Sequence, residues 1–139
     1  MSKRTGVRVL IVDDDRSCCQ LIGDELDGLG FTTEWRTSAA EALELLQQRE
    51  YDVVVTDLRM RGMNGLELCE RIVSTRPDLP VIAITAFGSL DTAIAAIRAG
   101  AYDFVTKPFE TEALVVALNR AAEHRALREE VKRLRSVVA

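Results

Sequence analysis

Short apolar runs alternate along the chain with segments of helical periodicity. The most continuous runs predict strands that are buried on both faces of a parallel sheet. They are Val7–Val12, Val53–Val55, Val81–Ile84 and the less apolar Tyr102–Val105. Phe31–Trp35 instead alternates apolar and polar residues, which predicts a strand at an edge of the sheet.

Apolar residues spaced three and four apart lie between these runs and predict amphipathic helices. The clearest series span Cys18–Leu29, Leu66–Val73 and Leu90–Ile97, and a shorter one includes Leu43 and Leu46. Residues typical of helix ends accompany them: Ser38 with Glu41 as a capping box, Asn64 as an N-cap, and Gly30 and Gly100 at C-termini.

Strict alternation of strands and helices predicts an α/β domain with a doubly wound, five-stranded parallel sheet. The flavodoxin-like strand order 2-1-3-4-5 is the leading candidate, and a helix extends it at the C-terminus. In that order the first and third strands are neighbours, and ligands bind beyond their carboxyl ends. Asp13, Asp14 and Asp15 follow the first strand and Asp57 ends the third, so we expect these carboxylates to share one crevice.

A cluster of carboxylates without histidine or cysteine suits Mg²⁺ or Mn²⁺. Such a cation offsets the repulsion between the carboxylates, although acidic residues at this point also serve as simple helix caps. Thr85 ends the fourth strand and Lys107 follows the fifth, at the same edge of the sheet. Carboxylate, cation, hydroxyl and ammonium together are the groups that stabilise a phosphoryl group during transfer.

The chain resembles the CheY-like receiver domains of response regulators over about residues 7–122. The matching segments are Ile11–Asp14, Val55–Met60, Gly62–Gly65, Ile84–Ala86 and Gly100–Phe109. Their order and spacing, taken together, are highly specific. The resemblance implies a signalling domain that catalyses only its own phosphorylation and dephosphorylation.

The same resemblance implies a role for each site residue. Asp57 is the expected phosphoacceptor. Asp14, Asp57 and the backbone carbonyl of Arg59 are expected to hold Mg²⁺, with Asp13 acting nearby through water. Asp15 has no fixed role in the family and is expected to cap the next helix.

Thr85 and Lys107 are expected to bind the phosphoryl oxygens, and Phe104 stands where the family keeps its switch aromatic. The sequence departs from the family at Arg61, where a proline is usual and would stiffen the loop. Arg59 and Phe87, two positions beyond Asp57 and Thr85, are bulky enough to slow the loss of a phosphoryl group.

We divide the chain into a receiver domain, residues 1–122, and a helical segment, residues 123–139. That segment resembles the linker after the receivers of NtrC-type, sigma-54-dependent transcription activators, and we expect it to lead to an output domain outside this sequence. Apolar residues recur in it at 4-3-4 spacing and predict a short parallel helix pair; they are Leu127, Val131, Leu134 and Val138. We expect a second apolar set to lie along the face formed by the fourth helix, the fifth strand and the fifth helix, and a homodimer to pair through this face and the helical segment; the set is Ile94, Ile97, Tyr102, Phe104 and Leu118.

The implied function is that of a two-component response regulator. A sensor histidine kinase phosphorylates Asp57, and the change controls ATPase and DNA-binding domains of a longer protein, with the receiver paired as a homodimer. An aspartyl-phosphate-forming phosphatase is the alternative, because Asp13-Asp14-Asp15 contains the Asp-x-Asp pattern of that class. A nucleotide binder is a weaker reading, since no glycine-rich phosphate-binding motif occurs.

Charge and composition limit the classes of partner and the cellular compartment that we expect for this chain. The net charge is −4, and residues 119–135 hold six Lys or Arg against three Glu, so the rest is acidic. This distribution does not predict direct nucleic-acid binding by the chain itself. No apolar run reaches the length of a membrane span, and three cysteines form no disulfide or zinc pattern, which favours the cytoplasm.

Overall fold

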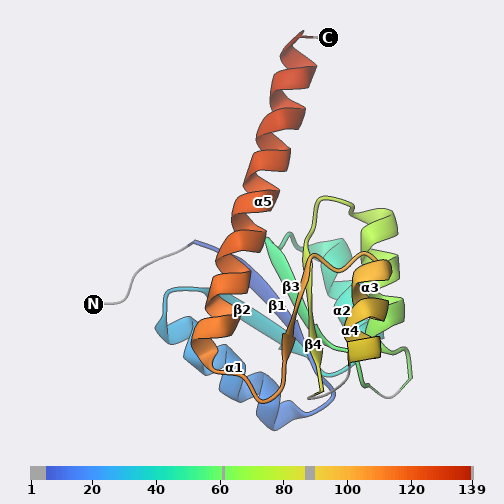
Figure 1. The fold of residues 1–139 in the computed structure, drawn as a ribbon. Coiled ribbons are helices and arrows are strands. Elements are labelled where there is room, and N and C mark those ends of the chain that lie inside the picture. Colours follow the sequence, from blue (N-terminus) through green and yellow to red (C-terminus); the bar gives the residue numbers. More distant parts are fainter. Residues whose placement is uncertain (1–5, 61, 87–89, 139) are drawn as a thin grey trace.

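The computed structural model describes residues 6–60, 62–86 and 90–138. Its centre is a parallel sheet of five strands in the order β2-β1-β3-β4-β5 (Figure 1). The strands are β1 (Arg8–Val12), β2 (Thr32–Arg36), β3 (Val53–Asp57), β4 (Val81–Thr85) and β5 (Asp103–Thr106). This order confirms the predicted doubly wound, flavodoxin-like fold and the edge position of β2.

The helices form a layer on each face of the sheet. They are α1 (Arg16–Gly28), α2 (Ala39–Gln48), α3 (Gly65–Thr75), α4 (Leu90–Arg98) and α5 (Thr111–Val138). Helices α1 and α5 cover one face, and α2, α3 and α4 cover the other (Figure 1). Side chains alternate between the faces, so that Val9 and Ile11 pack in one core and Leu10 and Val12 in the other.

Side chains at the helix starts confirm the predicted caps. The Ser38 hydroxyl accepts the backbone N–H of Glu41 at 3.1 Å, and Asn64 Oδ1 accepts that of Glu67 at 2.9 Å. Asp15 Oδ1 accepts the N–H of Ser17 at 3.0 Å. Each bond satisfies a donor that the helix itself leaves unpaired.

Helix α5 is continuous over 28 residues and extends well past the amino-terminal edge of the sheet (Figure 1). The proposed boundary between residues 122 and 123 therefore falls inside one helix. The part from residue 123 to residue 138 is called the tail below. No helix among the described residues is long and apolar enough to cross a membrane.

The prediction that Leu118 lies on the surface was wrong. Its side chain is completely buried, because it shares the sheet-facing side of α5 with Leu114 and Ala121. Val116, on another side of the helix, is half exposed instead. A helical repeat in the sequence does not by itself say which side meets the sheet.

Gly65 allows α3 to start directly against the loop that follows Asp57. Its backbone N–H donates to the Leu58 carbonyl at 3.2 Å. A Cβ atom at this position would lie 2.3 Å from the Asp57 carbonyl oxygen and 2.6 Å from Leu58 Cα. Both neighbours are backbone atoms, so neither can move aside without displacing the end of β3.

We expect Gly65→Ala to lower the free energy of unfolding by about 1–3 kcal/mol, the usual cost of overpacking. The matched control is Gly28→Ala, because a Cβ there meets nothing within 4 Å. That control should leave stability unchanged or raise it by up to about 1 kcal/mol, since alanine is the better helix former. Urea denaturation of both variants measures the difference, and equal stabilities would contradict this account of Gly65.

Candidate functional site

Parallel pairing of β1 with β3 brings two acidic residues to one edge of the sheet. Val12 pairs with Thr56, so Asp13 and Asp57 follow side by side at the carboxyl ends of these strands. Lys107, in the loop after β5, reaches between them. Its Nζ atom lies 2.8 Å from Asp57 Oδ2 and 3.6 Å from Asp13 Oδ2. The structure thus brings together three of the residues that the sequence singled out.

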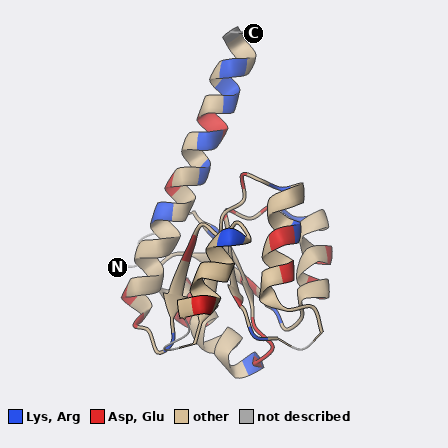
Figure 2. Ribbon diagram, turned by 45° about the vertical axis from the view of Figure 1, so that its right-hand side comes forward, with Lys and Arg blue, Asp and Glu red and all other residues tan. Residues whose placement is uncertain are grey.

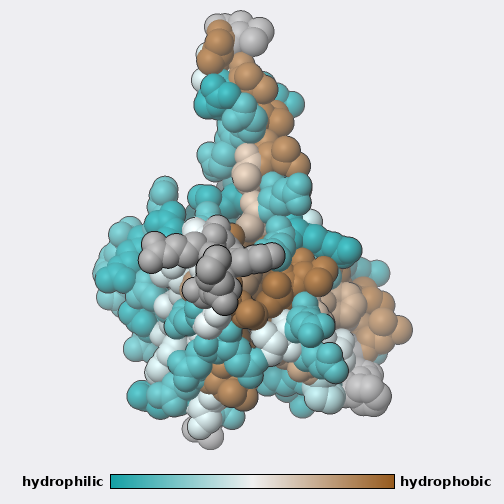
Figure 3. Space-filling view, turned by 90° about the vertical axis from the view of Figure 1, so that its left-hand side faces the viewer, coloured by the Kyte–Doolittle hydropathy of each residue, from teal (hydrophilic) through white to brown (hydrophobic). Residues whose placement is uncertain are grey.

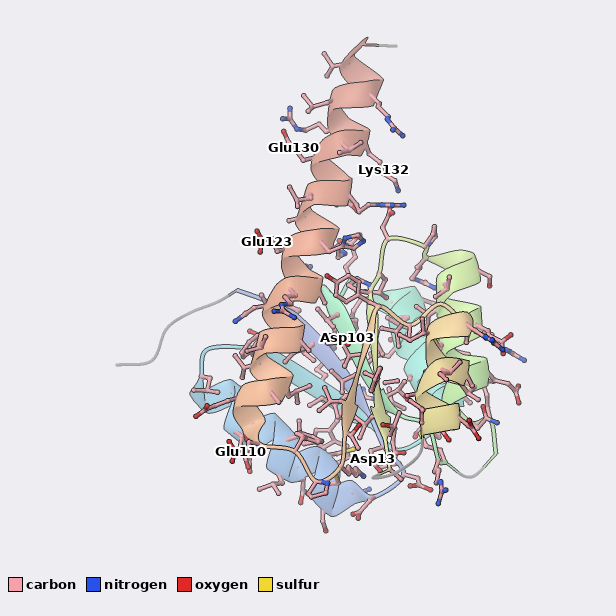
Figure 4. The ribbon with its side chains drawn as sticks, in the orientation of Figure 1. Asp13, Asp103, Glu110, Glu123, Glu130 and Lys132 are labelled. Carbon is pink, nitrogen blue, oxygen red and sulfur yellow. The ribbon has the colours of Figure 1, made fainter. Side chains whose placement is uncertain are left out.

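Asp13 is a buried carboxylate, exposed by only 1%. Its Oδ1 atom accepts the backbone N–H of Asp15 at 2.9 Å, whereas its Oδ2 atom has no hydrogen-bond partner among the described residues. Burial raises the pKa of Asp13 above its ordinary value, and the neighbouring charge of Asp57 adds to that effect. Figure 4 shows Asp13 at the carboxyl ends of the strands, whereas the tail projects beyond their opposite ends.

Lys107 supplies the positive charge of the site. Burial on its own would lower its pKa, but the hydrogen bond and charge of Asp57, followed by the charge of Asp13, raise it. Its backbone N–H donates to the Thr85 carbonyl at 2.8 Å, which ties the loop after β5 to the end of β4. The ammonium group therefore stays charged beside both carboxylates.

Asp57 is held by both of its oxygens. Oδ2 accepts from Lys107, and Oδ1 accepts the backbone N–H of Arg59 at 2.8 Å. The buried Thr56 hydroxyl, one residue earlier, donates to the Asp57 carbonyl at 3.0 Å. These bonds fix the carboxylate at the end of β3, where a molecule can approach it from solvent.

Thr85 lies at the same edge, at the end of β4, and is almost completely buried. Its hydroxyl lies 3.2 Å from the Thr106 hydroxyl, and either group can be the donor. Sequence reasoning missed Thr106. The parallel register, in which Thr85 pairs with Thr106, is the signal that identifies it.

Asp14, Arg59 and Phe104 are site residues that lie on the surface. The Asp14 side chain is exposed in the loop between β1 and α1. Phe104, on β5, is 37% exposed and lines an apolar groove of about 290 Å³ along α4 with Leu90, Ile94 and Ile97. Arg61 and Phe87 lie outside the described residues.

The cysteines near the site are protonated thiols. Burial, assisted by the Asp13 carboxylate, raises the pKa of Cys18 to about 11 and that of Cys19 to about 12. A protonated thiol is a poor nucleophile. The groups at this edge that can take part in a reaction are therefore the carboxylates, the Thr85 hydroxyl and the Lys107 ammonium.

The carboxylates of Asp13 and Asp14 offer oxygen ligands of the kind that Mg²⁺ prefers, and Asp13 Oδ2 lacks a hydrogen bond among the described residues and lies 3.6 Å from Lys107 Nζ. Within the described part of the chain, no three His, Cys, Asp or Glu side chains are already gathered around one point. A cation here would depend on two carboxylates supplemented by a backbone carbonyl and water.

We expect Asp13→Asn to raise the free energy of unfolding at pH 7 in buffer with a chelator. The raised pKa means that folding disfavours the charged form of Asp13, and asparagine removes that charge while keeping an acceptor for the Asp15 N–H. Below pH 3.8, the ordinary pKa, Asp13 is protonated in both states and the gain disappears. As pH rises from 3.8 through the folded pKa, the wild-type protein loses stability relative to the variant.

Urea denaturation at several pH values measures this gap. Asp15→Asn is the control, because this exposed cap is replaced by an equally good capping residue and should show no such gain. A gap between wild type and Asp13→Asn that is constant across this pH range would contradict the account of Asp13.

Comparisons with known proteins agree on one family. The model of the response regulator receiver domain matches residues 9–119. The C4-dicarboxylate transport transcriptional regulatory protein DctD of Rhizobium meliloti is 42% identical over 127 residues, which cover 91% of this chain and 28% of DctD. The DNA-binding transcriptional regulator NtrC of Escherichia coli K12 is 40% identical over 116 residues, covering 84% of this chain and 25% of NtrC.

Solved structures give the same result. NtrX from Brucella abortus in complex with ADP superimposes with a TM-score of 0.87 at 34% identity, over 96% of this chain and 30% of that one. A response regulator receiver domain protein from Clostridium thermocellum has a TM-score of 0.83 at 30% identity and is covered over 98% of its length. The chain spans less than a third of DctD and of NtrC. The chain belongs to the response regulator receiver domain family.

Proposed function

We propose that this chain is a phosphoacceptor switch, in which a partner histidine kinase donates a phosphoryl group to Asp57. The observation that carries the proposal is the contact of the Lys107 ammonium with Asp57 and Asp13 at the carboxyl edge of the sheet. In a receiver domain, this arrangement supplies a nucleophile and a neighbouring positive charge for a phosphoryl group.

In the transfer step, an oxygen of Asp57 attacks the phosphorus atom of a phosphohistidine. The oxygen–phosphorus bond forms as the phosphorus–nitrogen bond breaks, and the imidazole leaves with the bonding electrons. The Lys107 ammonium, which pairs with the carboxylate before transfer, then pairs with a phosphoryl oxygen. Its flexible four-carbon side chain permits this change of partner. The Arg59 N–H orients the carboxylate before the attack.

The residues fit a Mg²⁺ ion held by Asp14, Asp57 and the carbonyl of Arg59, with Asp13 contributing through water. Asp13 Oδ2 is buried, lacks a hydrogen bond among the described residues and meets Lys107 only at 3.6 Å, which supports this assignment, because a second cation nearby would further offset the cost of its burial. When bound, Mg²⁺ would neutralise part of the charge that develops on the phosphoryl oxygens.

Thr85 and Phe104 couple the site to the surface. A phosphoryl oxygen competes for the single hydroxyl proton of Thr85, which now lies within hydrogen-bond distance of Thr106. Movement of Thr85 toward the site would leave space for Phe104, which is 37% exposed on the neighbouring strand. The shape of the groove along α4 then depends on the state of Asp57.

We assign the downstream role from the relatives. DctD and NtrC are transcriptional regulators by name, and NtrX was solved with ADP. The helical segment of residues 123–139, which includes the tail, would lead to ATPase and DNA-binding domains of the NtrC type, in the cytoplasm. No finding supports the phosphatase alternative.

We expect wild-type protein incubated with acetyl phosphate and Mg²⁺ to gain the mass of one phosphoryl group, and Asp57→Asn to gain none. An amide cannot act as the nucleophile, although it keeps the size and shape of the carboxylate. Intact-mass spectrometry measures both proteins. Asp15→Asn is the matched control and should label like wild type, and labelling of Asp57→Asn would place the acceptor elsewhere.

We further propose that the chain forms a homodimer through the exposed apolar residues of α4 and β5 and through the tail. Ile94, Ile97 and Phe104 are each exposed by a third to a half, and Leu127, Val131 and Leu134 are exposed along the tail. Figure 3 shows apolar residues following the tail toward the body of the protein. The tail seam is too short to hold a dimer alone. The predicted seam residue Val138 lies outside the described side chains.

Sedimentation at several concentrations, with and without beryllofluoride, tests the dimer. We expect association whose strength differs between the two states, and Leu127→Glu should weaken it about tenfold or more, because it places a charge in the seam. Ala126→Glu adds the same charge on another side of the helix and serves as the control. A monomer in both states, or equal effects of the two substitutions, would contradict the dimer.

A further inference from the structure

The sheet and the other four helices are called the body of the protein here. The side of α5 that faces this body changes from apolar to cationic where the helix leaves the sheet. Leu114, Leu118 and Ala121 are buried against the strands. The next residues on the same side, at helical spacing, are Arg125, Arg128 and Lys132. Figure 2 shows basic residues recurring along this part of the helix.

Each of these cations meets a carboxylate of the body. Arg125 Nη1 lies 3.0 Å from Asp52 Oδ1, and Arg128 Nε lies 3.3 Å from Asp78 Oδ1. Lys132 pairs with the other oxygen of Asp78. In the Arg125–Asp52 pair both side chains are less than a quarter exposed, so this contact is better shielded from water than an ordinary surface ion pair. The Asp78 side chain is only 11% exposed, whereas its partners Arg128 and Lys132 are more than half exposed.

Asp52 and Asp78 both lie in segments that backbone hydrogen bonds hold in place. Asp52 comes immediately before β3, accepts the backbone N–H of Arg8 at 2.8 Å and donates its own N–H to the Arg8 carbonyl at 2.8 Å. Asp78 precedes buried Leu79, whose N–H donates to the Arg76 carbonyl at 3.0 Å. Little freedom is lost on pairing with such groups, which favours the contact over one between two flexible side chains.

The hydrogen bond from Lys132, followed by the charges of Lys132 and Arg128, lowers the pKa of Asp78 below its ordinary value. The carboxylate is therefore ionised across the neutral range. Isolated exposed pairs contribute little, but here each carboxylate meets two cations: Asp52 pairs with Arg8 and Arg125, and Asp78 pairs with Arg128 and Lys132. A helix that projects alone into water is only marginally stable over this length.

The apolar stripe of the tail lies on a different side of the helix. At about 100° per residue, Leu127, Val131 and Leu134 do not overlap with the side that holds Arg125, Arg128 and Lys132. Figure 4 shows Lys132 on the side of the tail toward the body and Glu130 on the side away from it. The helix can thus contact the body and still present its stripe to a second copy.

We propose that Asp52 and Asp78 are positioning residues that clasp the tail to the receiver through Arg125, Arg128 and Lys132. The clasp fixes the direction in which α5 leaves the sheet, so that the receiver and the first turns of the tail move as one body. It acts at the edge of the sheet opposite Asp57. The proposal rests on the proposed function only in treating the tail as the connection to an output domain.

Amide hydrogen exchange tests the clasp in the double variant Asp52→Asn, Asp78→Asn. We expect residues 126–132 to exchange about tenfold faster than in wild type, because three weak ion pairs are lost together. Residues 112–121 should not change, since apolar packing holds them, and they report on whether the receiver remains folded. Added salt should speed exchange of residues 126–132 in wild type but have little effect in the variant.

Glu130→Gln is the matched control. It removes an ion pair with Arg133 on the same helix and touches neither Asp52 nor Asp78, so it should leave residues 126–129 at the wild-type rate. Unchanged exchange in the double variant, or the same increase in Glu130→Gln, would overturn the clasp. Labelling with acetyl phosphate is measured in parallel. Normal labelling with unchanged exchange refutes the clasp alone, and faster exchange without labelling in any protein refutes the phosphoacceptor function alone.

Discussion

The parallel pairing of β1 with β3 is the constraint on which the site depends. It places Asp13 beside Asp57 at the carboxyl ends of two buried strands, where two negative charges would repel each other. Lys107 offsets that repulsion from a third strand end, and its contacts tie β1, β3 and the loop after β5 into one unit. A chain with the same residues in another strand order would have scattered acids rather than a site.

The negative charges at this edge are only partly neutralised by hydrogen bonds and by Lys107. Asp13 is buried, one of its oxygens has no hydrogen bond among the described residues and meets Lys107 only at 3.6 Å, and burial raises its pKa. In the proposed function, such a site would accept a cation, and Lys107 would exchange a carboxylate oxygen for a phosphoryl oxygen once Asp57 is phosphorylated. Thr85, whose hydroxyl pairs with that of Thr106 at the next strand end, is tied to the same site through its carbonyl, which accepts the Lys107 backbone N–H.

Helix α5 connects this edge with the opposite one. It begins near the site, packs against the sheet through its apolar side and continues past the amino-terminal edge, where Asp52 and Asp78 meet its cationic residues. The two contact types occupy one side of a single helix, and the exposed apolar stripe occupies another. In the two proposals above, the same helix therefore holds the tail in a fixed direction relative to the receiver and pairs with a second copy of the chain.

The sequence by itself determined the strand order, the helix caps and the residues at the carboxyl edge. Buried parallel strands carry continuous apolar runs, and capping residues act on neighbours three positions away, so both signals are local. Once the strand order is known, the acidic residues and the lysine at the carboxyl ends of the strands are expected to lie close together. Tertiary structure decided what depends on contacts between distant segments: the burial of Leu118, the pairing of Thr85 with Thr106 and the ion pairs of the tail. A helical repeat shows that a helix has sides, but only packing decides which side meets the sheet and which carboxylate a distant arginine reaches.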